Sequence, residues 1–183
     1  MEGGDNLLAK YSELDPRFAQ TIGYQGSVWS DEIGTLDFLP GGAHNVSYDK
    51  TKHLVRKWVP RSLKATSPRN YTNVDWILFR VAELYLNYAE ALNEYQGPCT
   101  EAFNAVNEVR SRSGMPGFPT SLDQNAFREK LRNERAVELA FEDHRFWDIR
   151  RWMLAEGEGV MQGKMYGLQL SKIVGSTEVR YKP

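Results

Sequence analysis

The hydrophobic positions of the chain change their spacing near residue 74. From there to Tyr95, apolar side chains recur at the 3.6-residue period of an α-helix, and Gly97 with Pro98 ends the run. The positions that carry this period are Ile77, Val81, Leu84, Tyr85, Tyr88, Ala91, Leu92 and Tyr95. The pattern predicts one long amphipathic helix that begins at about residue 74.

A second helix follows after a short turn. Thr100 is a good N-cap, Phe103, Val106 and Val109 share one face, and Gly114 supplies a C-terminal stop. Because the connection is short, the two helices should run antiparallel. The hairpin is typical of one tetratricopeptide unit, but no second copy follows at a period of about 34 residues, so the chain does not predict a solenoid.

A third, longer helix is expected after the loop at 115–119. Ser121 or Asp123 can cap it, and a break is expected between Glu142 and His144. A short fourth helix then carries Phe146, Trp147 and Trp152.

The rest of the chain is less regular. Up to about Asn73 it is rich in Gly, Pro, Ser, Asp and aromatic residues, which favours loops with a few short strands, and after Gly157 it is Gly-rich and polar. We therefore expect a mainly α fold in a single domain, 1–183. Its parts are a loop-rich segment (1–73), a helical core (74–156) and a polar tail (157–183).

Composition narrows the function classes. The chain of 183 residues is 41% hydrophobic and 26% charged, as a globular protein should be. A net charge of -1 and a pI of about 6.3 argue against nucleic acid as a partner. The single cysteine, Cys99, excludes an internal disulfide, and no run approaches the roughly 20 apolar residues of a membrane span. We expect the chain to be soluble, and its Met-Glu-Gly-Gly start suggests a fragment of a longer protein.

The third helix has an unusual face. At helical spacing, one stripe starts with Phe127 and Leu131 and continues with Glu134, Glu138 and Arg145, so it turns ionic without leaving the core side. Charges placed there need partners. The candidate partners are Arg80, Arg110, Arg112, Arg135, Arg145, Arg150 and Arg151. The sequence therefore predicts a buried or half-buried network of arginine and glutamate.

Catalysis is the alternative interpretation of the same acids. Glu134, Glu138 and Glu142 recur every four residues, about 6 Å apart along a helix, near the roughly 5 Å carboxyl separation of a retaining glycosidase. That chemistry needs one carboxyl kept protonated, whereas the many arginines nearby favour ionised acids. We expect no catalytic residues here.

Metal and cofactor sites are not indicated either. His44, His53 and His144 are too scattered for a helical metal motif, and no Gly-rich phosphate loop or Gly-x-Ser-x-Gly motif occurs. We therefore expect no metal, no cofactor and no enzymatic activity.

Four motifs, in order, resemble the C-terminal half of the SusD/RagB family. They are DPRF from Asp15 to Phe18, WILFRVAELYLNYAEALNE from Trp76 to Glu94, FNAVNEVRSRSGMP from Phe103 to Pro116, and RNERAVELAFEDHRFWDIRRW from Arg132 to Trp152. Because the motifs match only this half, we expect the chain to be a fragment without the family's N-terminal half, which carries the signal peptide, the anchoring cysteine and most of the tetratricopeptide-like helices. The matched residues belong to the scaffold, so no ligand contact can be transferred by position.

The resemblance implies a SusD-like helical core and a function. Members are lipid-anchored proteins on the outer face of the outer membrane of Bacteroidetes-type bacteria. They bind glycans or other nutrients and cover a SusC-like TonB-dependent transporter. We expect the longer parent protein to bind a glycan or nutrient there without catalysis, and to meet the membrane only through a lipid anchor.

The chemistry of sugar binding indicates which residues can form the ligand site. Sugars stack on exposed aromatic rings and hydrogen-bond to planar polar side chains. In the N-terminal segment Trp29 and Tyr24 are the best candidates, followed by Trp58. Further candidates are Gln25, Asp31, Phe38, His44, Asn45 and Tyr48. The alternative function is a helical protein–protein interaction module, formed by the hairpin and the Trp-bearing fourth helix, that binds no sugar.

Overall fold

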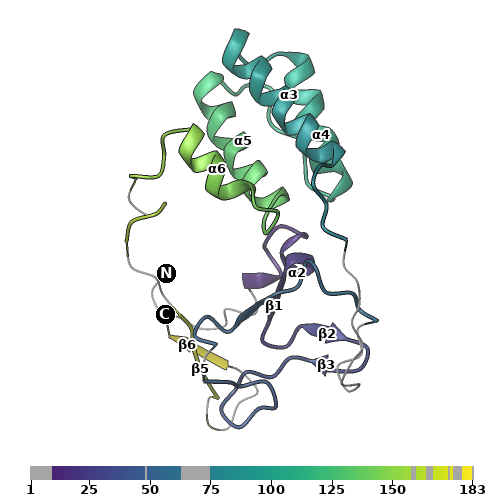
Figure 1. The fold of residues 1–183 in the computed structure, drawn as a ribbon, viewed down its shortest axis with the longest axis vertical. Coiled ribbons are helices and arrows are strands. Elements are labelled where there is room, and N and C mark those ends of the chain that lie inside the picture. The colour runs from purple at the N-terminus through teal and green to yellow at the C-terminus, as the bar shows by residue number, and fades with distance from the viewer. Residues whose placement is uncertain are drawn as a thin grey trace. The chain divides into compact units, whose positions relative to one another are not determined.

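The structure, a computed structural model, divides into two compact units. It describes residues 10–47, 49–62, 75–157, 160–163, 167–172, 174 and 179–182 (Figure 1). One unit combines Met1–Val74 with Gly163–Pro183, and the other is Asp75–Gln162. The single-domain expectation stays a prediction.

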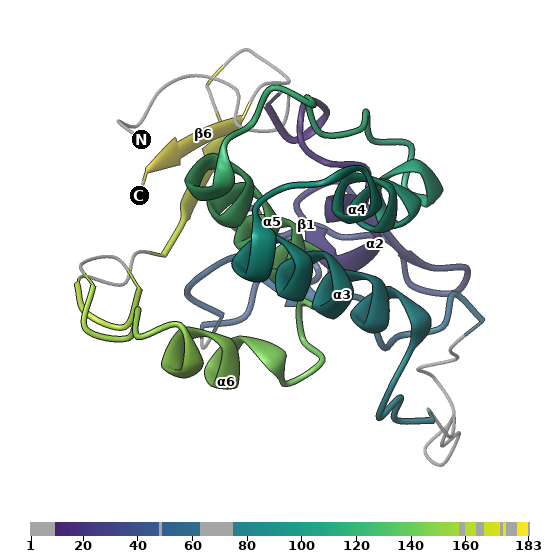
Figure 2. The same cartoon turned by 90° about the horizontal axis from the view of Figure 1, so that it is seen from above.

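The helical unit contains the helices that the periodicity predicted. They are α3 (Val81–Gln96), α4 (Thr100–Arg112), α5 (Gln124–Glu138) and α6 (His144–Arg151). α3 packs against both α4 and α5 (Figure 2). The expected mainly α fold is confirmed.

Local chemistry explains where these helices end. Gly97 ends α3 at φ 87°, a conformation that favours glycine. Cys99 is the N-cap residue of α4, one position before the predicted Thr100. The Asp123 side chain caps α5 by accepting a 2.8 Å hydrogen bond from the amide of Ala126. The break before His144 occurs as predicted, because α5 ends at Glu138.

The start of the first helix was predicted wrongly. α3 begins at Val81, and residues 75–80 precede it in irregular conformation. Arg80 is the N-cap residue, with extended backbone (φ −148°, ψ 156°). The hydrophobic pattern runs on through this segment, but its backbone leaves the helical region at Arg80.

An aromatic and aliphatic core lies between the helices. Leu86, Val106 and Phe127 are fully buried, and Phe127 meets the rings of Phe103 and Phe118 edge-to-face at centroid distances of 5.0 and 5.7 Å. The predicted inward face of α4 is confirmed.

The face that α3 turns toward this core is not its apolar stripe. Its buried residues are Glu83, Leu86, Ala89 and Asn93. Exposed residues of the stripe are Val81, Leu84, Tyr85, Tyr88, Ala91 and Tyr95. α3 therefore has one face packed in the core and a second apolar face turned away from it.

The other unit consists of loops with short paired segments, as predicted for the N-terminal part. The helix α2 (Phe18–Thr21) leads into β1 (Ile22–Tyr24), which pairs antiparallel with β4 (His53–Val55). β2 (Val28–Ser30) pairs antiparallel with β3 (Gly34–Thr35). A small core of Leu36, Phe38, Leu39 and Leu170 fills this unit, with Trp29, Leu54 and Leu168 packed against it.

The tail is more ordered than its composition suggested. β5 (Gln169–Lys172) and β6 (Val179–Lys182) form an antiparallel hairpin. Leu170 is buried in the small core, and the amide of Leu168 donates to the carbonyl of Lys50 at 2.9 Å. These contacts with the N-terminal segment, rather than any local pattern, position this part of the tail.

Candidate functional site

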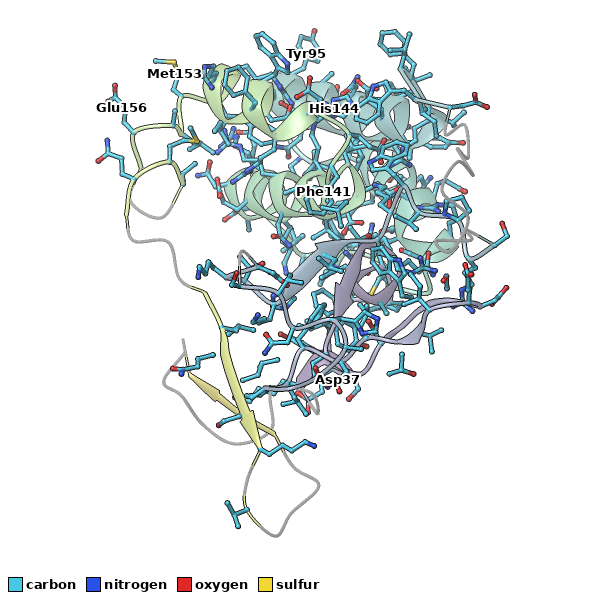
Figure 3. All side chains as sticks on the ribbon, turned by 60° about the horizontal axis from the view of Figure 1, so that its bottom comes forward. Asp37, Tyr95, Phe141, His144, Met153 and Glu156 are labelled. Atoms are coloured by element: carbon cyan, nitrogen blue, oxygen red, sulfur yellow. The ribbon has the colours of Figure 1, made fainter. Side chains whose placement is uncertain are left out.

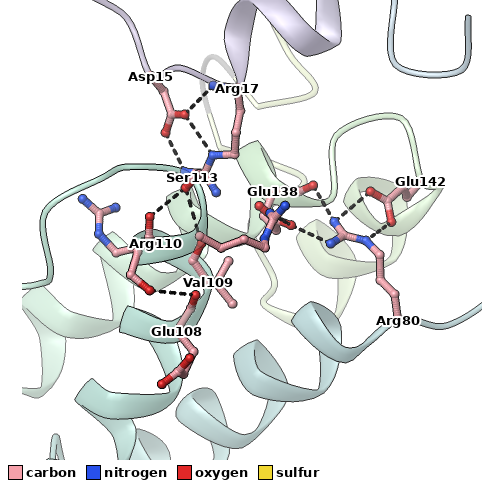
Figure 4. Close-up of polar contacts among 11 residues, drawn as sticks. Asp15, Arg17, Arg80, Glu108, Val109, Arg110, Ser113, Glu138 and Glu142 are labelled. Atoms are coloured by element: carbon pink, nitrogen blue, oxygen red, sulfur yellow. Dashed lines mark hydrogen bonds and ion pairs between the residues drawn. The ribbon is translucent and has the colours of Figure 1, made fainter. Parts of the chain in front are cut away.

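A cluster of ion pairs and hydrogen bonds in the helical unit surrounds Arg80. Its Nη1 lies 2.5 Å from Oε1 of Glu138, and its Nε lies 2.6 Å from Oε2 of Glu142 (Figure 4). Its Nη2 donates to the backbone carbonyl of Glu138 at 2.7 Å. Burial lowers the pKa of Arg80, but the hydrogen bonds to the two carboxylates raise it more, so the guanidinium stays charged.

The same face of α5 binds two arginines of α4. Arg110 forms an ion pair with the buried Glu134, and Arg112 reaches Glu138 at 2.6 Å. The guanidinium of Arg110 also lies over the Phe118 ring, 4.8 Å from its centroid. The predicted ionic continuation of the apolar stripe, Glu134 and Glu138, is therefore confirmed.

A second branch of the network joins α6 to the other helices. Arg135 is buried, and its Nε donates to Oδ2 of Asp148 at 2.7 Å while its Nη1 donates to Oδ1 of Asn87 at 2.5 Å. Arg151 bridges the other oxygen of Asp148, at 2.9 Å, and Glu90, at 2.8 Å. Glu90 lies on α3, so this branch ties three helices together.

Glu90 also accepts a 2.8 Å hydrogen bond from the indole nitrogen of Trp152. Partial burial raises the pKa of Glu90, but the hydrogen bonds from Arg151 and Trp152 lower it more, so it lies below its usual value. These donors stabilise the carboxylate form and therefore fix the end of α6 against α3.

Two predicted partners lie outside this network. Arg145 is exposed, so its predicted place on the inward stripe is wrong: the chain leaves the α5 helix at Glu138 and the stripe does not continue through the break. Arg150 is exposed as well and lies over the ring of Phe146, with its Cζ 3.5 Å from the ring centroid.

The three glutamates of the catalytic interpretation all form ion pairs in this network. Glu134, Glu138 and Glu142 are buried, and each is bound to an arginine of another segment. A retaining glycosidase needs one carboxyl group free to protonate a leaving group. The arrangement suits a scaffold better than a catalytic pair.

Tyr24, a predicted ligand residue, lies in an aromatic cluster of the N-terminal unit. Its ring meets that of Tyr11 edge-on at 4.8 Å and stacks on Phe18 at 5.4 Å. His53, which faces Tyr24 across the β1–β4 pair, joins the cluster through Tyr11. Neighbouring protein rings thus cover much of Tyr24.

A short hydrogen-bond chain runs through this cluster. The hydroxyl of Tyr11 lies 2.7 Å from Nε2 of His53, whose Nδ1 lies 2.7 Å from the carbonyl of Thr51. Because a carbonyl only accepts, Nδ1 carries a proton, and in the neutral imidazole Nε2 is then the nitrogen that accepts from the Tyr11 hydroxyl. Burial, and then the neighbouring Tyr24, raises the pKa of Tyr11 to about 12.

Trp29, the other leading candidate, packs on the opposite side of β1. A Cβ atom on Gly23 would come within 2.8 Å of the Trp29 ring, so the indole lies directly on this glycine. The guanidinium of Arg56 lies 5.5 Å from the ring centroid. Since neighbouring residues of a strand face opposite ways, Tyr24 and Trp29 do not form one platform.

The remaining predicted residues have varied positions. Trp58 lies half-buried in the turn after β4, and Phe38 is buried in the small core. Gln25 accepts a 2.5 Å hydrogen bond from the amide of Phe38, and His44 accepts one of 3.0 Å from Asp37. Asp31 and Asn45 are exposed, and Tyr48 lies outside the described residues.

An exposed aromatic pair on α6 was not among the predicted ligand residues. Phe146 and Trp147 meet edge-to-face at 5.0 Å, and the Trp147 side chain is 62% exposed. The buried Asp148 and Ile149 fix which side of α6 faces inward, and that leaves this pair outside. Phe141 and His144, labelled in Figure 3, mark the turn that leads into it. This orientation depends on the ion pair of Asp148 with Arg135 of α5, a contact between two helices that the sequence does not display.

In the described part of the chain, no group of three or more His, Cys, Asp or Glu side chains is placed to hold a metal ion. Within the same residues, no helix combines the length and apolar character needed to cross a membrane.

Comparison with known proteins identifies the family. The model of the SusD family matches residues 2–173. The SusD-like proteins P25 and P38 of Formosa agariphila are 43% and 32% identical over 93 and 111 residues, which are 47% and 56% of this chain. Those stretches are only 17% and 21% of the two relatives.

Solved structures agree with the sequence comparison. A SusD-like protein from Bacteroides fragilis is 30% identical, with a TM-score of 0.78 over 98% of this chain and 35% of its own. A SusD homolog from Bacteroides thetaiotaomicron is 31% identical, with a TM-score of 0.55 over 87% of this chain and 36% of its own. The chain spans about a fifth of the curated relatives' length and about a third of these structures. With its sequence matched from residue 2 to 173 and its fold shared with solved relatives, this chain belongs to the SusD family.

Proposed function

We propose that the chain is part of a non-catalytic glycan- or nutrient-binding protein on the extracellular face of the bacterial outer membrane. The family match over residues 2–173 carries this proposal. In the proposed role, the full-length protein is held by a lipid anchor. It passes its ligand to a SusC-like TonB-dependent transporter.

The distribution of charge supports binding rather than catalysis. The buried carboxylates Glu134, Glu138 and Asp148 are each held by an arginine within the helical unit. Such pairs stabilise a scaffold, because an unpaired buried charge is costly. Ligand recognition then falls to aromatic and polar side chains of the loops.

We place the ligand contacts in the N-terminal unit, at Trp29, Tyr24 and Trp58. Tyr24 stacks on Phe18 and Trp29 lies on Gly23, so a sugar has to use the part of each ring that these contacts leave uncovered. Trp58 is half-buried in a turn, the kind of position from which a ring can stack on a ligand. Among the three, Trp58 is the residue on which we expect affinity to depend most.

A glycan array on the full-length protein, followed by calorimetric titration of the best ligand, tests this. Trp58→Ala should weaken affinity about tenfold, equal to about 1.4 kcal/mol, with little change in melting temperature. Trp29→Ala should lower the melting temperature, because truncating a packed indole leaves a cavity. An unchanged affinity in Trp58→Ala, together with a folded protein, would move the site elsewhere.

Delivery to a transporter needs its own experiment. A tagged full-length protein, purified from outer membranes in mild detergent, should carry a TonB-dependent transporter with it. Purification without the transporter, under conditions that keep other outer-membrane complexes intact, would contradict this part of the proposal.

A protein-interaction module is the second candidate function, and exposed aromatics on α6 favour it. Phe146 and Trp147 are 44% and 62% exposed, and aromatic residues are enriched in protein interfaces. Loss of the transporter on Trp147→Ala, with no glycan bound by any variant or by the parent, would favour this function over sugar binding.

A further inference from the structure

Arg56 differs from the other buried arginines of the described chain. Arg17, Arg56 and Arg135 are each at most 7% exposed. Arg17 lies 2.5 Å from Oδ2 of Asp15, and Arg135 lies 2.7 Å from Oδ2 of Asp148. Among the residues that the structure describes, no carboxylate forms such a pair with Arg56. A buried cation without an anion is costly, so Arg56 is the buried arginine that can still accept one.

Two uncharged groups hold the guanidinium of Arg56. Its Nη1 donates to the carbonyl of Val59 at 3.0 Å, and its Cζ lies 5.5 Å from the centroid of the Trp29 ring. Its Nε and Nη2 form no hydrogen bond with described residues, and neither is one of the unpartnered side-chain atoms sealed from solvent, so both keep some exposed surface. The same edge of Arg128 binds both oxygens of Glu94 at 2.6 Å.

Arg56 also belongs to the turn that carries Trp58. The amide of Val59 donates to the carbonyl of Arg56 at 2.9 Å, which closes this turn around Trp58. Because the guanidinium of Arg56 also lies over the ring of Trp29, one arginine connects two of the three residues to which we assign ligand contacts.

The charges around this turn leave Arg56 available to an anion from outside the chain. All charged residues between positions 56 and 61 are basic: Arg56, Lys57 and Arg61. The amide of Asp31 donates to the carbonyl of Arg61 at 3.1 Å, so the end of β2 brings Asp31 and Glu32 to the same segment. Neither of these acids forms an ion pair with Arg56.

We propose that Arg56 is an anion subsite of the ligand site and that the ligand is an acidic glycan. A carboxylate or sulfate group of the glycan accepts hydrogen bonds from Nε and Nη2, since the planar guanidinium edge fits two oxygens of one anion. The sugar ring next to that group stacks on Trp58. This inference rests on the proposed glycan-binding function and adds the class of glycan to it.

The first experiment is a glycan array on the full-length protein. The array carries oligogalacturonates, sulfated galactan oligosaccharides, the methyl-esterified and desulfated counterparts of both, and neutral gluco- and xylo-oligosaccharides. Binding of one acidic series above its uncharged counterpart is expected, and the series that binds distinguishes a carboxylate from a sulfate. Binding of neutral glycans alone would overturn this inference and leave the proposed function intact, whereas a protein that binds no glycan would overturn both.

The second experiment titrates variants calorimetrically with the bound acidic oligosaccharide and its uncharged counterpart. Arg56→Gln should weaken affinity for the acidic ligand about tenfold, because it removes a charge-assisted pair, and should change affinity for the uncharged one less than about twofold. Arg56→Lys keeps the charge without the planar edge and should bind with intermediate affinity. If Arg56→Gln does not fold, Arg56→Lys carries this comparison.

Arg150→Gln is the matched control. Arg150 also lies over an aromatic ring, 3.5 Å from the centroid of Phe146, and donates to a backbone carbonyl, at 3.3 Å. It is exposed and belongs to the helical unit, so its substitution should leave both affinities unchanged. An equal loss of acidic and uncharged ligand in the Arg56 variants would overturn the inference, because Arg56 would then only support the ring of Trp29.

Discussion

At the scale of single residues, Arg80 connects the start of α3 with the end of α5 and the turn after it. It lies before α3, yet it binds Glu138 at the end of α5 and Glu142 in the turn that follows. Bringing charges out of water costs free energy, which is offset only when each has good hydrogen bonds. Here three guanidinium nitrogens of Arg80 are satisfied by four contacts, so removing one partner should be costly.

Glu138→Ala should lower the free energy of unfolding by about 3 kcal/mol, because it removes the carboxylate that pairs with both Arg80 and Arg112. Urea denaturation of the purified chain measures this loss. Glu129→Ala is the control on the same helix: Glu129 forms an exposed pair with Arg132, and its loss should cost less than about 0.5 kcal/mol. If both variants lose the same small amount of unfolding free energy, the ion pairs of Glu138 contribute no more to stability than an exposed pair.

The lowered pKa of Glu90 predicts how the stability of the chain depends on pH. Its pKa in the folded chain lies below the ordinary value of 4.5, since the hydrogen bonds of Arg151 and Trp152 outweigh the effect of burial. A carboxyl group whose pKa is lower in the folded than in the unfolded chain stabilises the fold at pH values above its unfolded pKa. This stabilisation is lost as the pH falls through the pKa of the folded chain.

The urea midpoint should therefore fall between about pH 7 and about pH 3.5. Glu90→Gln should show a smaller fall over the same range, because it lacks this titrating group. A fall of the same size in Glu90→Gln would assign the acid sensitivity to other carboxyl groups.

At the scale of elements, short capping signals fix where helices begin and end. α5 starts after Asp123, whose carboxylate accepts from the amide of Ala126, and α3 ends at Gly97. Between α5 and α6, Phe141 and Asp143 adopt positive φ angles of 60° and 65°, so the chain turns sharply there. That turn separates the inward Glu138 from the outward Arg145.

Asp123→Ala should destabilise the chain by about 1 kcal/mol through loss of this cap. Asp123→Asn keeps an acceptor at the same place and should cost only a few tenths of that. Thermal denaturation followed by circular dichroism at 222 nm compares the two. Similar losses in both variants would show that the charge of Asp123, more than its hydrogen bond, stabilises the start of α5.

At the scale of the whole molecule, two units share one chain and differ in how they are held together. The helical unit combines an aromatic core around Phe127 with the network of Arg80 and Arg135. The other unit relies on short strands and on the small core to which Leu170 contributes.

The proposed binding role predicts that the chain leaves oligosaccharides intact. Incubation with a panel of oligosaccharides, analysed by mass spectrometry, should yield no cleaved product. Product that forms with the parent chain and disappears in a folded Glu134→Gln variant would instead assign catalysis to the acids of α5.

The sequence alone determined the helical core and the family. Periodic apolar residues, Gly97 and Asp123 are local signals, and the ionic stripe of Glu134 and Glu138 needed only the geometry of one helix. These features depend on neighbours three or four residues away, which a sequence displays directly.

Only the tertiary structure decided which faces these helices present and which residues meet. The more apolar side of α3 is exposed, whereas the side that packs on α4 and α5 combines Leu86 and Ala89 with the polar Glu83 and Asn93, so the hydrophobic pattern did not show which side is buried. Gly23 and Arg56 come to Trp29 from two different strand regions, and Lys50 meets Leu168 across more than a hundred residues. Such contacts form between segments that are far apart in the sequence. Local spacing does not predict them, because each contact depends on the path of all the residues between the two segments.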